Sequence, residues 1–101
     1  MTEHIVESKL VAKRHGRFTN LVFQLISNPN EYLMCTIMPN WNIPEINIDD
    51  VGFLQYIIVF PGDEYLDIET GEIKNYRYRQ NYLVNFILSP KIKLKQQELI
   101  L

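Results

Sequence analysis

The sequence has little cysteine, little glycine and no long hydrophobic run, and each scarcity excludes a class of protein. A single cysteine, Cys35, cannot form an internal disulfide, which fits a reducing compartment and predicts a cytoplasmic protein. The 4 glycines form no Gly-rich loop before a helix, so the phosphate-binding loops of nucleotide-dependent enzymes are missing. The longest apolar run, "IIVF", is too short to cross a membrane, and the N-terminal "MTEHIVESKL" lacks a signal peptide's apolar core. We therefore expect a soluble, unexported protein without a membrane partner.

Signatures of catalysis and metal binding are also missing. His4 and His15 are too few and too poorly placed for a zinc site. Cys35 has no local base to activate it and lies in the apolar run "EYLMCTIM", so we expect a buried thiol. The stretch "GDEYLDIETGE" gathers carboxylates but lacks the alternating ligands of a calcium-binding loop, so we expect a solvated hairpin. These carboxylates are Asp63, Glu64, Asp67, Glu69 and Glu72. We predict no cofactor, no metal and no enzymatic activity.

The composition that is present is that of one folded domain. The chain has 101 residues, of which 47% are hydrophobic and 22% charged, so it can bury a core but has no room for a second one. We expect a single domain over residues 1 to 101. Residues 90 to 101 follow the last apolar stretch and are predicted as a peripheral tail, an edge strand, a short helix or a partner-binding segment.

Apolar residues alternate with polar ones along most of the chain, and this period of two predicts strands. "RHGR" and "NPN" are turn sequences, and "ETGE" is predicted as the tip of a hairpin over "EYLDIETGEIKNYRYR". "PNWNIPEINIDD", residues 39 to 50, is predicted as a long loop because prolines and asparagines disfavour helix and central strand. The run "VGFLQYIIVF" is apolar on both faces and predicts a strand covered on both sides. Further strands are expected over residues 5 to 13, 18 to 27, 31 to 38 and 82 to 89.

Five to seven short strands in this length favour an all-β fold, a small antiparallel barrel, because closure removes exposed strand edges. A β-sandwich is the alternative. The strand count and the long connection at residues 39 to 50 resemble the OB-fold, a five-stranded Greek-key barrel, although that connection usually holds a helix. The resemblance implies a fold used to bind oligonucleotides, oligosaccharides or proteins, and it assigns no residues.

Positive charge is absent from the middle of the chain. All 10 basic residues lie outside residues 18 to 73, which contain most of the acidic residues. If the first and last strands lie near each other, the molecule has a basic side and an acidic side. A basic side can bind phosphates even on a chain of net charge −2, because the local potential decides.

The stretch "NYRYRQNY", residues 75 to 82, alternates tyrosine with arginine. In a strand, Tyr76 and Tyr78 share one face while Arg77 and Arg79 share the other. Outward tyrosines would offer rings on which bases stack, with the guanidinium groups near phosphates. Inward tyrosines would be ordinary core rings and the arginines a soluble outer face. The alternation alone leaves both readings open.

Two functions of different classes remain. The first is a non-catalytic module that binds single-stranded nucleic acid, serving replication, recombination or a mobile element. The many Ile, Asn and Tyr residues suggest an A+T-rich coding sequence, and short single-domain proteins without an enzyme motif are common in phages and mobile elements. The second is a protein-interaction or self-assembly module, including a homo-oligomer, that uses opposite charges. Trp41, in the polar loop, either stacks a ligand or plugs the barrel. Phe18 and Tyr32 either are exposed rings near the first hairpin or belong to a minor second core. The candidate nucleic-acid site is Lys13, Arg14, Arg17, Trp41, Lys74, Tyr76, Arg77, Tyr78 and Arg79.

Overall fold

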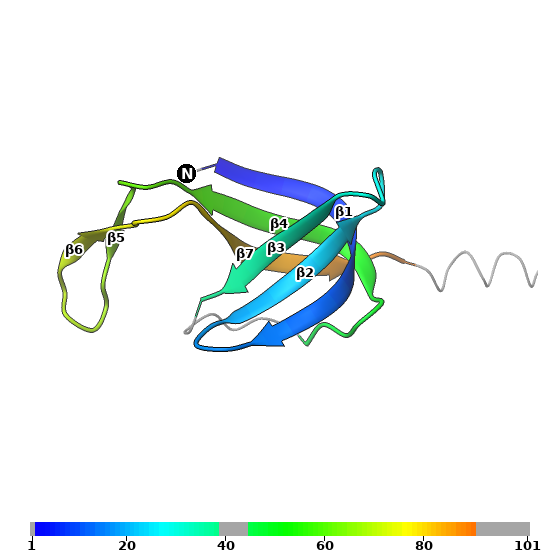
Figure 1. Cartoon of the computed structure of the whole chain (residues 1–101), viewed down its shortest axis with the longest axis horizontal. Helices are drawn as coiled ribbons and strands as arrows, with labels where there is room; N and C mark the ends of the chain where they lie inside the picture. The colour runs from blue at the N-terminus through cyan, green and yellow to red at the C-terminus, as the bar shows by residue number, and fades with distance from the viewer. Residues whose placement is uncertain (1, 39–44, 91–101) are drawn as a thin grey trace, which may run out of the picture.

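A computed structural model describes residues 2 to 38 and 45 to 90, and its regular elements are all strands (Figure 1). None of these residues belongs to a helix that is long and apolar enough to cross a membrane. The strands are β1 (Thr2–His15), β2 (Thr19–Leu25), β3 (Tyr32–Ile37), β4 (Val51–Val59), β5 (Glu64–Leu66), β6 (Ile73–Asn75) and β7 (Gln80–Leu88).

Five of the strands close into a barrel in the order β1, β2, β3, β7, β4. Every described pairing in the ring is antiparallel except that of β3 with β7, which is parallel and registers only Thr36 with Tyr82. The all-β class and the small barrel are thus confirmed, and the closed ring distinguishes the fold from the β-sandwich alternative. The β3–β7 seam is the weakest joint of the ring, because a single registered pair holds it.

The barrel interior is filled by alternate residues of the ring strands. Leu21 and Phe23 point inward from β2, as their period of two predicts, and are 3% and 0% exposed. Phe23 packs on Phe86 of β7 with ring centroids 5.4 Å apart. The buried core consists of Leu10, Leu21, Phe23, Cys35, Ile46, Leu54, Leu83 and Phe86. Burial of these side chains is the main source of the fold's stability.

A glycine allows β4 and β7 to approach closely at one end of the barrel. A Cβ at Gly52 would lie 2.3 Å from the carbonyl oxygen of Ile87 and 2.9 Å from the Phe86 ring. No side chain fits there without moving backbone. Gly52 is therefore required for packing between strands.

The end of the predicted long loop is tied to a bulge in β1. The register of β1 with β2 shifts between Leu10 and Ala12. At this bulge, Leu10 N donates a hydrogen bond to Asp50 O at 2.9 Å, and Leu10 O accepts one from Asp49 N at 2.8 Å. Asp49 adopts a φ of 75°, and the Asp50 carboxylate accepts a hydrogen bond from Asn47 N. Residues 45 to 50 are thus an ordered loop, as predicted, while residues 39 to 44, including Trp41, lie outside the described residues.

The second hairpin is confirmed, and it projects from the barrel. β5 and β6 pair from Glu64↔Asn75 to Leu66↔Ile73, and they join β4 to β7 as a two-stranded arm (Figure 1). Gly71 has a φ of 72°, which suits the turn predicted at "ETGE". We call residues 60 to 79 the arm.

Three sequence expectations about strands do not hold. β4 is not covered on both sides, because Phe53 is 43% exposed on its outer face. The segment "NYRYRQNY" does not form one continuous strand, since β6 ends at Asn75 and β7 begins at Gln80. The first and last ring strands, β1 and β7, are also not neighbours, because β4 lies between them.

Candidate nucleic-acid interface

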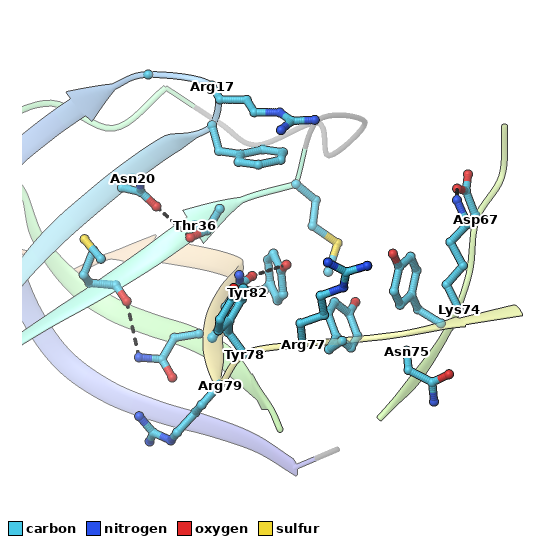
Figure 2. Close-up of a pocket in the computed structure, with 18 of the residues that line it drawn as sticks. Arg17, Asn20, Thr36, Asp67, Lys74, Asn75, Arg77, Tyr78, Arg79 and Tyr82 are labelled. Carbon is cyan, nitrogen blue, oxygen red and sulfur yellow. Dashed lines mark hydrogen bonds and ion pairs between the residues drawn. The ribbon is translucent and has the colours of Figure 1, made fainter. Parts of the chain in front are cut away.

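An open groove lies between the barrel and the arm (Figure 2). On the barrel side it is formed by the turn between β1 and β2 and by residues of β2, β3 and β7. On the other side it is formed by the arm. The groove exists because the arm leaves the barrel at the β4–β7 connection instead of folding back on it.

Two basic segments that are distant in the sequence meet at this groove. Arg17 comes from the first turn and Arg77 and Arg79 from the end of the arm, and all three line the groove. Figure 2 shows Arg17 on the barrel side and Arg77 between barrel and arm. The Arg79 side chain points away from Arg17 and Arg77. The Arg79 guanidinium lies 6.0 Å from the centroid of the Phe60 ring. Four basic side chains line the groove against two carboxylates, Asp67 and Glu69.

Three aromatic rings at the groove are free to contact a ligand. Tyr78 is 70% exposed, Tyr32 is 60% exposed and Phe18 is 45% exposed. Of the two alternatives for Phe18 and Tyr32, the structure supports exposed rings and not a second core. The Arg17 guanidinium lies 5.7 Å from the Phe18 centroid, so a positive charge adjoins an exposed ring at the first turn. Rings beside guanidinium groups can stack bases while neutralising phosphates.

The other tyrosines of the arm contact one another. Tyr76 lies between Tyr65 and Tyr82, with ring centroids 4.5 Å and 5.8 Å away. Burial raises the pKa of Tyr76 and of Tyr82 above the ordinary tyrosine value. The Tyr82 hydroxyl donates a hydrogen bond to the side chain of Gln80 (Figure 2). This tyrosine ladder, Tyr65, Tyr76 and Tyr82, fixes the arm to β7. The alternating pattern thus contains two kinds of tyrosine, half-buried rings at 76 and 82 that pack on other tyrosines and an exposed ring at 78.

The far end of the arm is held by one ion pair. Lys74 Nζ lies 2.6 Å from Asp67 Oδ2 and donates a hydrogen bond to it. This hydrogen bond lowers the pKa of Asp67 and raises that of Lys74. Lys74 lines the groove as predicted, but its charge is already paired. It is therefore a weaker phosphate ligand than the arginines.

Two carboxylates of the arm, Asp63 and Asp67, accept hydrogen bonds from backbone amides in its turns. Asp63 accepts a hydrogen bond from Phe60 N at 2.9 Å, and Asp67 accepts one from Glu69 N at 3.0 Å. Among residues 2 to 38 and 45 to 90, no three His, Cys, Asp or Glu side chains are grouped so that they could hold a metal ion. The structure therefore explains Asp63 and Asp67 by the hydrogen bonds that they accept within the hairpin.

Polar groups that the sequence did not single out lie on the barrel side of the groove. The Thr36 hydroxyl donates to Asn20 Oδ1 at 2.6 Å, and Asn81 Nδ2 donates to Met34 O at 3.3 Å across the β3–β7 seam (Figure 2). Met34 is 49% exposed and follows Tyr32 by two positions, so the period of β3 could have indicated it. Asn20, Thr36 and Asn81 carried no local signal, because only the tertiary fold brings them together.

Six of the nine candidate residues line the groove, and two of the described ones do not. Lys13 and Arg14 lie at the exposed end of β1 but are not among its lining residues, and Trp41 lies outside the described residues. Those that line the groove are Arg17, Lys74, Tyr76, Arg77, Tyr78 and Arg79.

The groove offers charge, flat rings and hydrogen-bonding groups. Cys35 is fully buried in the core, where desolvation raises its pKa to about 12, so its thiol is neutral at physiological pH. The arrangement suits reversible binding of a flexible anionic ligand. Comparisons of the chain with models of known protein families, with curated proteins and with solved structures found no match.

Proposed function

We propose that the protein is a non-catalytic module that binds single-stranded nucleic acid in the groove between barrel and arm. The observation that carries the proposal is that Arg17 and Arg77 line one groove that also presents the exposed rings of Tyr78 and Tyr32. Guanidinium groups attract phosphates, and stacking on aromatic rings is worth about 1 to 3 kcal/mol per base. A duplex would hide the faces of its bases, so a single strand fits these rings better.

We further propose that the barrel is of the OB-fold type. Support comes from the ring order, in which the third and fifth ring strands, β3 and β7, pair in parallel. In OB-folds, ligands bind on the face of strands 2 and 3 and between the loops that join strands 1 to 2 and 4 to 5. The groove occupies the corresponding place, with the arm as the connection between the fourth and fifth ring strands. An accessory role in replication or recombination, in a phage or mobile element, would suit such a module.

Fluorescence anisotropy tests the proposal. A labelled 20-nucleotide single strand is titrated with the full chain and with the double variant R77A/R79A at low salt. We expect micromolar or tighter binding by the parent protein and at least tenfold weaker binding by the variant, since two phosphate-binding charges are lost. The variant should keep its melting temperature, because Arg77 and Arg79 are exposed.

A matched control is K13A/R14A, which removes two positive charges outside the groove. Equal weakening by this control would show that general charge, and not the groove, attracts the strand. No binding by the parent protein at low salt would overturn the proposal. The alternative, a protein partner, would then be favoured by Leu66 and Ile73, which form an apolar pair on the arm and are 59% and 63% exposed.

A further inference from the structure

The arm has an apolar face that the proposed function does not use. Tyr65 packs on Tyr76, which packs on Tyr82 of the barrel, so these rings mark the face of the arm that is turned toward the barrel. Side chains alternate between the two faces along a strand, so Leu66 and its cross-strand partner Ile73 lie on the opposite face. They are 59% and 63% exposed and form an apolar pair on a sheet of only two strands.

The outer edge of β5 is open and acidic. In the part of the chain that the structure describes, β5 and β6 pair only with each other, and an unpaired strand edge is a template for another strand. A two-stranded sheet is marginally stable, and a third strand that covers apolar residues stabilises it. Residues 60 to 73 contain five acidic residues and no basic one, and Asp67 is the only one of them in an ion pair within the described ranges. A basic strand therefore suits the edge of β5 better than that of β6, where Lys74 lies and Arg77 follows.

Residues 91 to 95, which we call the tail segment, have a sequence that matches this edge. They lie outside the described residues and read "KIKLK", an alternation typical of a strand with one basic and one apolar face.

β5 and its two flanking residues, 63 to 67, read "DEYLD". When the centres of the two segments lie side by side, each aspartate is beside a lysine in either strand direction, because aspartates end one segment and lysines end the other. Leu66 is then beside Leu94 in the parallel direction and beside Ile92 in the antiparallel one. Glu64 is the one acidic residue of the five that is left beside an apolar side chain. The tail segment thus complements the edge of β5 in charge and in apolar contact.

The tail segment is too far from the arm of its own copy to bind it. The arm leaves the barrel at the Gln80 end of β7, and Leu66 lies beyond that end (Figure 1). β7 has 9 residues, so its two ends are about 26 Å apart. The chain passes Leu88 and Pro90 at the other end, and the four residues from Pro90 to Leu94 span at most about 14 Å. An arm that binds this segment therefore belongs to a second copy.

We propose that the tail segment of one copy adds as a third strand to the edge of β5 in the arm of another copy. Main-chain hydrogen bonds to the open edge supply affinity, and the alternating lysines and apolar side chains supply specificity. Because tail meets arm, the contact is heterologous and joins copies into a closed ring or an open chain. The proposal does not rest on the ligand that the groove binds.

The mass of the full chain in solution tests this contact. It is measured by sedimentation and light scattering over a concentration series that reaches the millimolar range, at moderate salt and without nucleic acid. We expect the parent protein to rise from its monomer mass of 12.0 kDa to at least twice that mass. The tail variant I92S/L94S and the arm variant L66S each lose apolar contacts, so each should associate about tenfold more weakly. I5S is the matched control, because Ile5 is 68% exposed on the barrel, and it should associate as the parent protein does.

A mixture of the two variants distinguishes a contact between tail and arm from any other contact. The tail variant keeps an intact arm, and the arm variant keeps an intact tail. We therefore expect equal amounts of the two to form mixed dimers at a concentration where each variant alone is monomeric. Melting temperatures show that each variant is folded, and the tail variant alters no residue of the arm.

Four results overturn the proposal. They are a parent protein that is monomeric at every concentration, association of I92S/L94S as strong as that of the parent protein, equal weakening by I5S, and a mixture that stays monomeric. Oligonucleotide binding by a monomeric parent protein would leave the groove proposal intact. Association without oligonucleotide binding would overturn the groove proposal alone, so the two proposals fail separately.

Discussion

At the residue scale, the buried cysteine links the core to the pH dependence of stability. Cys35 was expected to be a buried thiol because it lies in an apolar strand, and it is completely buried. Burial raises its pKa from 9.0 to about 12, because a thiolate loses its hydration inside the barrel. The folded state therefore keeps its proton at a pH where the unfolded chain loses it. Stability should be unaffected below pH 9 and should fall between about pH 9 and 12.

The prediction is that the Cys35 thiol alone lowers the free energy of unfolding by about 1.4 kcal/mol between pH 8 and pH 10, one pH unit above the unfolded pKa. Urea unfolding at both pH values gives this loss. C35A is the control, since it lacks the thiol but retains the tyrosines whose pKa burial also raises, Tyr56, Tyr76 and Tyr82. An equal loss in C35A would show that the thiol does not contribute.

At the scale of elements, sequence periodicity predicted most of the strands but not how the arm attaches. Inward residues such as Leu21 and Phe23 could be identified because one face of β2 is buried and the other is not. The segment "NYRYRQNY" was read as a strand because tyrosine and arginine alternate along it. Its backbone leaves the two-stranded sheet after Asn75, although this alternation continues. The half-buried Tyr76 packs on Tyr65, eleven positions earlier, and the period of two does not reveal a partner at that distance. The role of each tyrosine is therefore set by tertiary contacts.

The tyrosine ladder predicts that Y76A lowers stability, whereas Y78A, two positions away, lowers oligonucleotide affinity. Y76A removes the ring between Tyr65 and Tyr82, so we expect about 2 kcal/mol lower stability and faster hydrogen exchange at Gly62 and Asp67, whose amides bond within the arm. Y78A should change stability by less than about 0.5 kcal/mol, because Tyr78 is 70% exposed, yet weaken oligonucleotide binding about tenfold. Urea unfolding and anisotropy separate the two effects. A strongly destabilised Y78A would mean that this ring is structural.

At the scale of the whole molecule, the charge distribution could be read from the sequence, but the place where the charges meet could not. The basic residues of the two ends were expected to share one side if the first and last strands were neighbours. β4 separates those strands, and the charges meet instead because the first turn and the arm both border the groove. A loop and a hairpin tens of residues apart converge only after the barrel has closed. For the same reason the sequence could not exclude Lys13 and Arg14 from the site.

The salt dependence of oligonucleotide binding tests whether the first turn and the arm both contact the bound strand. For single strands, each phosphate contact contributes about 0.7 to the slope of log affinity against log salt concentration. If Arg17 and Arg77 each bind a phosphate in the groove, R17A and R77A should each reduce the slope by about 0.7, and the double variant by about 1.4. K13A is the matched control, because Lys13 lies on β1 close to Arg17 but does not line the groove, and its slope should equal that of the parent protein. An equal reduction in K13A and R17A would place the strand along β1 instead of across the groove. An unchanged slope in R77A would remove the arm from the binding surface.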